Sequence, residues 1–181
     1  GSAFEGMGAA REVTFAVFTE AGLFFAYLVF VKISGSLTMD KMLHASGNLI
    51  LNQGNIAPLL MIILGLTIII LAENCRIPVD DPNTHLELTM IHEVMVLDHS
   101  GPLFGLIEYT ASIKLFIFIS ILINIITPIY SQFLSLNWVI YLAEIIVASI
   151  LIGIVESVIA RLKMTLVPLF LVASILLCGS A

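Results

Sequence analysis

The sequence predicts an all-α integral membrane protein, a bundle of about five transmembrane helices with a charged loop between the second and the third. Composition is the first reason, because the 181 residues are 60% hydrophobic and only 11% charged, whereas soluble domains are about 45–50% apolar and about 25% charged. The mean hydropathy of +1.12 is the second reason. The third is that apolar segments of about 20 residues, the length that crosses a bilayer, recur along the chain without strand-like alternation.

Five apolar segments are the expected spans. In chain order they are Val13–Val31, Ile56–Ala72, Leu103–Thr127, Trp138–Ala160 and Thr165–Cys178. The last is short for a span, so we expect it to be tilted or to belong to a longer helix. Because the chain starts without Met and without a basic leader, we expect a fragment of a longer protein that forms a single membrane domain over residues 1–181.

Residues 73–102 form the charged loop within this domain. Pro78 and Pro82 prevent the preceding helix from continuing into it. Thr84 and Glu87 have the spacing of a capping box, in which the two side chains bind early backbone N–H groups of a helix. Apolar residues then recur at helical spacing, which predicts a short amphipathic helix. These apolar residues are Leu86, Met90, Ile91, Val94 and Leu97.

The distribution of basic residues between the loops predicts the orientation. With a cytoplasmic N-terminus, the charged loop and the turn after the fourth span share its side of the membrane. That side carries Arg11, Arg76, Arg161 and Lys163, and the opposite side carries Lys32 and Lys41. Because cytoplasmic loops carry the excess of Lys and Arg, we expect a multi-pass protein of the cytoplasmic (inner) membrane with the charged loop on the cytoplasmic side.

The residue types that bind metals do not form a ligand set. Cys75 and Cys178 are too few for an iron–sulfur cluster or a zinc ribbon. His85, His92 and His99 recur every seven residues, so one helix would carry them on one face but about 10.5 Å apart along its axis. We therefore expect no metal in this chain, and a histidine stripe that faces solvent or a partner. The net charge of −6, without a basic run, gives no indication of nucleic-acid binding.

Four glutamates lie inside the predicted spans, where an acidic side chain costs on the order of 2.5–3.5 kcal/mol. They are Glu20, Glu108, Glu144 and Glu156. Such residues mark ion paths or substrate sites, or they are salt-bridged packing groups. Glu108 and Lys114 are six residues apart, so each must find its partner on another helix or face water. Glu144 is then the candidate partner of Lys114 across the bundle, and the acids together would form a proton path.

The loop sequence ENCRIPVDDPNTHLEL, Glu73 to Leu88, resembles the signature of the membrane subunit called subunit 1 of respiratory complex I (NADH-quinone oxidoreductase). Related subunits anchor energy-converting membrane-bound nickel–iron hydrogenases, formate hydrogenlyases and hydrogenase-4-type complexes. The matching positions are Glu73, Arg76, Pro78, Asp80, Pro82, Glu87 and Leu88. Similar stretches around Glu20, Asp98, Glu108 and Glu156 extend the resemblance over essentially the whole chain.

The resemblance implies a membrane anchor, the C-terminal part of an eight-helix-type subunit, beneath a peripheral redox arm. An acidic path would comprise Glu20, Glu73, Glu87, Glu108, Glu144 and Glu156. Docking would fall to Arg76, Asp80, Asp81, His85, Glu93 and Asp98, on a loop shaped by Pro78, Pro82 and Thr84. The chain would bind no redox cofactor itself. The nickel–iron centre and iron–sulfur clusters would belong to partner subunits, antiporter-like membrane subunits would be neighbours, and a quinone is an additional candidate ligand.

Departures from the complex I pattern favour the hydrogenase branch. Asn83 and His85 stand where complex I members commonly have acids, Asp81 replaces an apolar residue, and the longer stretch after Leu88 contains Glu93. We therefore expect a subunit of a hydrogenase-type oxidoreductase complex that couples electron transfer to proton or sodium translocation.

Three alternatives to this function stay open. One is the quinone-binding subunit 1 of an NADH-quinone oxidoreductase. Another is an ion-coupled secondary transporter, although the sequence has no convincing paired repeat. The last is a purely structural anchor, whose glutamates inside the spans would all be salt-bridged.

Overall fold

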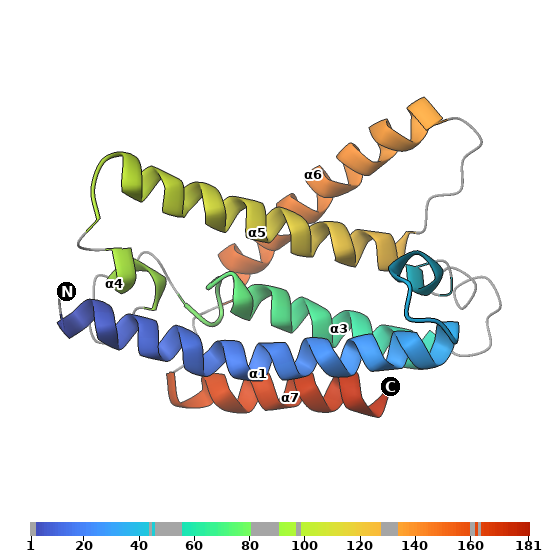
Figure 1. The fold of residues 1–181 in the computed structure, drawn as a ribbon, viewed down its shortest axis with the longest axis horizontal. Helices are drawn as coiled ribbons and strands as arrows, with labels where there is room; N and C mark the ends of the chain where they lie inside the picture. The colour runs from blue at the N-terminus through green and yellow to red at the C-terminus, as the bar shows by residue number, and fades with distance from the viewer. Residues whose placement is uncertain are drawn as a thin grey trace.

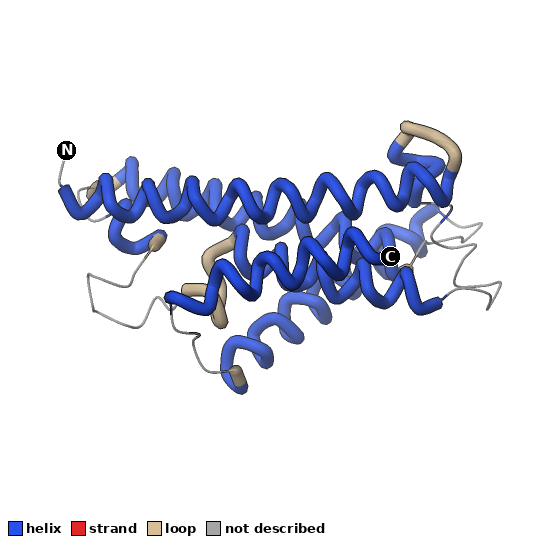
Figure 2. Tube along the Cα trace, turned by 90° about the horizontal axis from the view of Figure 1, so that it is seen from below, coloured by secondary structure: helices blue, strands red, loops and turns tan. Residues whose placement is uncertain are grey.

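The computed structural model describes residues 3–43, 45, 56–80, 91–96, 99–127, 134–159, 162 and 164–181. Over these residues the chain is helical, without a strand, as the sequence predicts (Figures 1 and 2). The elements are α1 (Ala3–Ser34), α3 (Ile56–Glu73), α4 (His92–Val96), α5 (Pro102–Ile126), α6 (Leu134–Val158), the short 3-10 helix η1 (Met164–Leu166) and α7 (Val167–Ser180).

The apolar helices match the five predicted spans. In the described part of the chain, three of them are long and apolar enough to cross a membrane: Glu5–Ser34, Pro102–Ile126 and Asn137–Val158. The other two are shorter, Ala57–Glu73 and Met164–Ser180. Helix α1 starts ten residues before the predicted span at Val13, because the Ala- and Gly-containing segment that precedes the span carries no proline to stop a helix.

Helices α1, α3 and α7 form the core of the structure and lie side by side in Figure 1. Branched and aromatic side chains fill the space between them, among them Phe30, Ile62 and Ile69, all buried. Gly65 of α3 allows a close approach to α7, because an added Cβ there would lie 2.5 Å from the Cys178 sulfur. This core places the C-terminal end of α3 against the middle of α1.

Helix α6 lies outside this core and packs on α5, which it crosses in Figure 1. The Tyr141 hydroxyl of α6 donates a 2.7 Å hydrogen bond to the Ser120 Oγ of α5. No described side chain in the span of α6, residues 137–158, is buried. Most of this apolar helix is therefore free to face lipid or other membrane subunits.

The C-terminal end of α3 turns the chain sharply into the charged loop. Cys75 has a positive φ of 48°, its N–H binds the Ala72 carbonyl at 3.1 Å, and the Arg76 N–H binds the Leu71 carbonyl at 2.8 Å. This pair of bonds is a Schellman motif, with Cys75 at the left-handed position that glycine usually occupies. A turn containing a cis Ile77–Pro78 bond follows.

Helix α4 packs on the first half of α1 through a close backbone contact (Figure 1). A Cβ added to Gly8 would lie 2.9 Å from the Ile91 carbonyl oxygen and 3.1 Å from the Met95 side chain. The glycine at position 8 therefore sets how near α4 comes to α1. Gly6, on the same helix, has nothing within 4 Å of the equivalent position.

We predict that Gly8→Ala lowers the thermal stability of the protein in detergent, whereas Gly6→Ala leaves it unchanged or raises it. Both changes gain about 1 kcal/mol of helix propensity, but only Gly8→Ala forces backbone apart, at a cost of about 1–3 kcal/mol. Thermal unfolding of the two variants and the wild type measures the difference. Equal stability of the two variants would show that the α1–α4 contact does not form.

Candidate functional site

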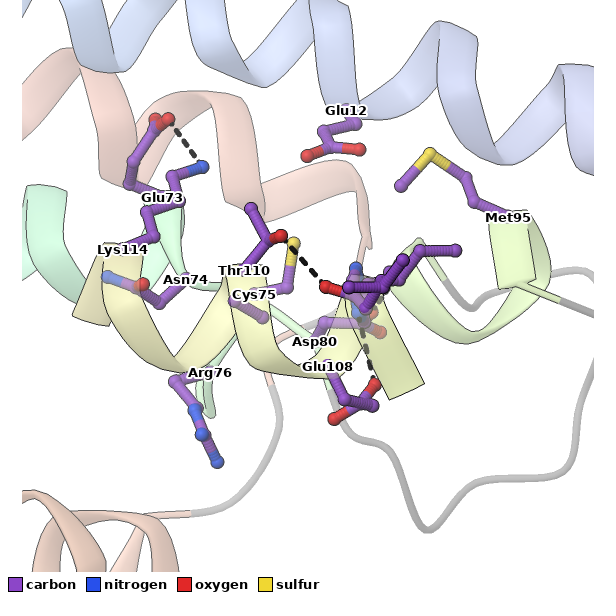
Figure 3. Close-up of a pocket in the computed structure, with 14 residues that line it drawn as sticks. Glu12, Glu73, Asn74, Cys75, Arg76, Asp80, Met95, Glu108, Thr110 and Lys114 are labelled. Atoms are coloured by element: carbon purple, nitrogen blue, oxygen red, sulfur yellow. Dashed lines mark hydrogen bonds and ion pairs between the residues drawn. The ribbon is translucent and has the colours of Figure 1, made fainter. Parts of the chain in front are cut away.

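A pocket of about 530 Å³ lies where the first halves of α1 and α5 extend past the end of α3 (Figure 3). The end of α3, the start of the charged loop and α4 complete its walls. Its lining carries four carboxylates, from Glu12, Glu73, Asp80 and Glu108. The pocket is therefore an acidic chamber between the charged loop and the membrane helices.

Glu73 forms the centre of a polar network that joins three helices. Lys114 Nζ of α5 lies 2.8 Å from its Oε1, and the Thr19 hydroxyl of α1 donates a 2.5 Å hydrogen bond to its Oε2. The Glu73 side chain is 16% exposed, so little water competes for it. Charge pairing and hydrogen bonding thus hold this carboxylate at the inner end of the pocket.

The predicted pairing of Lys114 with Glu144 is wrong, because Lys114 binds Glu73 instead. The geometry of α5 explains the difference. Ser120 faces α6 through its bond to Tyr141, and Lys114 is six residues earlier, which on a helix turns its side chain about 120° away from that direction. Lys114 therefore faces α3 and not α6.

Asp80 stabilises the loop from within. Its side chain is 2% exposed, and its Oδ2 accepts hydrogen bonds from the Ile91 N–H (3.0 Å) and the His92 N–H (3.1 Å). These are the first donors of α4, so Asp80 caps that helix from eleven residues away. Asp80 is one of the residues predicted to dock a partner, but its carboxylate is turned into the protein, away from the surface.

Arg76 connects the loop to the far end of α6. Its guanidinium lies 3.5 Å from Glu156 Oε1, and its side chain is 42% exposed, extending away from Glu73 and Lys114 in Figure 3. The Leu162 N–H binds the Pro78 carbonyl at 3.0 Å just beyond. The loop is thus attached to the connection between α6 and α7.

The histidines do not form the predicted stripe on one helix. Helix α4 ends at Val96, so His99 lies beyond it. His92 Nε2 lies 3.6 Å from Glu108 Oε1 on α5, and His99 Nε2 lies 3.5 Å from Glu5 Oε1 on α1. The two histidines therefore attach the loop to two different helices, and His85 lies outside the described residues.

The remaining candidate acids are not brought together. Glu20 is exposed at the middle of α1. Glu144 on α6 has a buried Oε2 without a hydrogen-bond partner among the described residues. Neither has an ion-pair partner in the described part of the chain, contrary to the expectation for a purely structural anchor. Outside the described residues lie Asp81, Pro82, Asn83, Thr84, Glu87, Asp98 and the side chain of Glu93.

Glu12 and Thr19 belong to the site although the loop signature does not contain them. They are seven residues apart on α1, so they lie on the same face two turns from each other. That shared helix face is the sequence signal for both. Among the described residues, no three His, Cys, Asp or Glu side chains are placed to hold a metal ion.

Burial raises the pKa of the Cys75 thiol to about 12, with Glu12 and Asp80 adding to the shift and Lys114 opposing it. A raised thiol pKa keeps the group protonated and unreactive at neutral pH, since the thiolate is the nucleophile. Against the ordinary value of 9.0, the thiolate at pH 8 is about a thousandfold scarcer.

We predict that alkylation of Cys75 by iodoacetamide rises about tenfold per pH unit from pH 8 to pH 10, as the thiolate fraction grows. An ordinary thiol levels off over this range. Mass spectrometry of the Cys75 peptide measures the rate, and the same peptide in SDS-denatured protein is the control. A plateau above pH 9 in the folded protein would contradict the raised pKa, independently of how accessible the thiol is.

Comparison with known proteins identifies the family. A family model described as NADH dehydrogenase matches residues 1–179, almost the entire chain. No curated protein and no solved structure matches the sequence of this chain. The resemblance to subunit 1 of complex I is thus confirmed at the level of the superfamily, and the hydrogenase branch stays a prediction. The chain belongs to the NADH dehydrogenase family, as a multi-pass, complex I-type membrane subunit.

Proposed function

We propose that the chain is the membrane anchor of a hydrogenase-type respiratory complex, in which it docks the peripheral electron-transfer arm and couples electron transfer to proton or sodium translocation. The observation that supports this best is the Thr19–Glu73–Lys114 network at the inner end of an acidic pocket. This network holds the Glu73 carboxylate between the charged loop and the membrane helices. Members of the family work beside redox modules, so a charged group at this position is suited to coupling.

Glu73 is the proposed coupling group. Its pair with Lys114 is favourable only while both side chains are charged, so a proton on Glu73 weakens the pair and frees Lys114 to move. Arg76 and Asp80 follow Glu73 by three and seven residues and line the same pocket, so in this proposal a change of charge or position at the loop alters the surroundings of this carboxylate. The acidic path would continue through Glu87, Glu108 and Glu156, with Glu20 and Glu144 toward neighbouring subunits.

The lining of the pocket carries both charged and apolar groups. Sites for small apolar ligands are lined mainly by hydrophobic and aromatic side chains with few polar groups. Here four carboxylates, Lys114 and Arg76 share the lining with Met95, Leu106, Ile107 and Ala111. The charged groups suit water and ions and the apolar groups suit a quinone, so the preference for the hydrogenase branch rests on Asn83, His85 and Asp81 of the loop.

Partners and cofactors follow from this assignment. The nickel–iron centre and the iron–sulfur clusters would be bound by peripheral subunits, and antiporter-like subunits would adjoin the chain in the membrane. The charged loop would face the cytoplasm, where the peripheral arm docks. The alternative is the quinone-binding subunit 1 of an NADH-quinone oxidoreductase, which the pocket volume of about 530 Å³ permits.

We predict that Glu73→Gln in the intact complex lowers ion translocation per electron severalfold, while uncoupled electron transfer stays within about twofold of wild type. The amide has the size of the carboxylate but takes up no proton and leaves Lys114 unpaired. Ion uptake and electron transfer measured together in membrane vesicles give the ratio. Translocation per electron equal to that of wild type would contradict the proposed role of Glu73.

Two further variants separate coupling from misfolding. Asp40→Asn makes the same chemical change beyond the C-terminal end of α1, far from the pocket lining, and should leave the ratio unchanged. The double variant Glu73→Gln, Lys114→Met removes the unpaired charge. It should restore the amount of assembled complex without restoring coupling.

The electron acceptor distinguishes the two branches. We predict that the purified native complex contains a nickel–iron subunit and evolves or consumes hydrogen without bound quinone. Identification of the co-purified chains by mass spectrometry, with quinone extraction from the same sample, tests this. Stoichiometric quinone together with an NADH-oxidising module would select the quinone-reducing alternative.

A further inference from the structure

A second, small cavity lies beside the acidic pocket, between α1 and the end of α3. Its volume is about 10 Å³, about the least space in which one water molecule fits. Ionisable side chains line both this cavity and the pocket: Glu12, Glu73, Cys75 and Lys114. The other lining residues of the cavity are apolar: Phe15, Ala16, Ala72 and Ile91. A buried water needs about two to four polar partners, so the cavity has both the room and the partners for one water molecule.

Glu12 differs from the other carboxylates of the pocket in its surroundings. Those three are held by backbone N–H groups, by a histidine or by a lysine. Glu12 is half-buried and has neither a hydrogen bond nor an ion pair with any described residue. Its side chain extends from α1 into the pocket, on the side of Cys75, in Figure 3. Of the neighbouring charges, Glu12 also raises the pKa of the Cys75 thiol most. The Glu12 carboxyl group is therefore placed to bind and release a proton at the pocket.

One face of α1 connects Glu12 with Glu73. Glu12, Ala16 and Thr19 are spaced four and three residues apart, so they share this face. Thr19 binds Glu73 directly. Ala16 lies between the two polar residues and lines the small cavity, and its methyl group leaves space that a larger side chain would fill. The face thus leads from the pocket, past the cavity, to the proposed coupling carboxylate.

We infer that Glu12 passes protons from the acidic pocket to Glu73 through one water molecule in the small cavity. Protonated Glu12 gives its proton to the water, and the water gives one of its own protons to the Glu73 carboxylate. The water is unchanged, Glu12 is left as a carboxylate, and it takes its next proton from water in the pocket. No electron moves in this step.

The inference rests on the coupling role of Glu73 proposed above and names the ion that reaches it. That ion is a proton, because a cavity for one water with the Lys114 ammonium group in its wall does not suit a sodium ion. Once Glu73 is protonated its attraction for Lys114 is lost, so each proton delivered by Glu12 opens the ion pair once.

Substitution of Glu12 in the intact complex tests the relay. We expect Glu12→Gln and Glu12→Ala to lower translocation per electron about tenfold, since neither side chain carries a proton. Acetate should restore translocation in Glu12→Ala, where the shortened side chain leaves room for a small carboxylic acid, and should not restore it in Glu73→Gln. Because acetate dissipates a pH gradient, the readout is the membrane potential of vesicles at equal rates of electron transfer, with the wild type in acetate as the reference.

Filling the cavity tests the water without changing any charge. Ala16→Val adds two methyl groups to the cavity wall and should lower translocation per electron severalfold, with or without acetate. Ala10→Val makes the same change at an exposed position of α1 and should leave translocation at the wild-type value. Co-purification of the other subunits with each variant verifies that the complex is assembled.

The outcomes separate this inference from the proposed function. Wild-type translocation in Glu12→Gln together with loss in Glu73→Gln would overturn the relay and leave the coupling role of Glu73 in place. Loss in Glu12→Ala that acetate does not restore would show a structural role for Glu12 and would also overturn the relay. Wild-type translocation in Glu73→Gln would contradict the proposed function itself.

Discussion

The position of a single carboxylate determines the arrangement of the functional half of the molecule. Glu73 ends α3, accepts a hydrogen bond from Thr19 near the middle of α1 and pairs with Lys114 near the middle of α5. Because α3 stops at this level, the first halves of α1 and α5 extend past it and enclose a pocket. The loop then fills part of that space, with Asp80 and Gly8 setting the place of α4. Removing the carboxylate would leave a partly buried ammonium group unpaired and abolish the polar contact that α1, α3 and α5 share.

The helices could be predicted from the sequence because each depends on local properties. Apolar composition marks five segments, and the predicted end of the second, at Ala72, is one residue from the end of α3 at Glu73. The start of α1 was harder to place, because the residues before Val13 are too polar to indicate a span and yet continue the same helix. Apolar composition predicts which residues cross the lipid. The ends of a helix are set instead by where its backbone N–H to C=O hydrogen bonds stop.

The site could be predicted only in part, because its contacts depend on how helices are rotated and shifted against one another. The loop signature identifies Glu73 and Asp80, and the similar stretch after it identifies Glu108; all three line the pocket. It does not indicate that Lys114 faces α3, since that follows from a rotation of about 120° relative to Ser120. Nor does it show that Asp80 caps α4 from a distant point of the chain, because such a bond requires the folded path of the loop.

Two contacts hold helix α6 against the rest of the described structure. It rests on α5 at the Tyr141–Ser120 crossing, and near its C-terminal end Glu156 is held by Arg76 of the loop. Tyr141 lies toward the start of the helix and Glu156 toward its end. Two points of attachment define the direction of a helix axis. The loop and α5 together therefore set the tilt of α6 relative to the rest of the bundle.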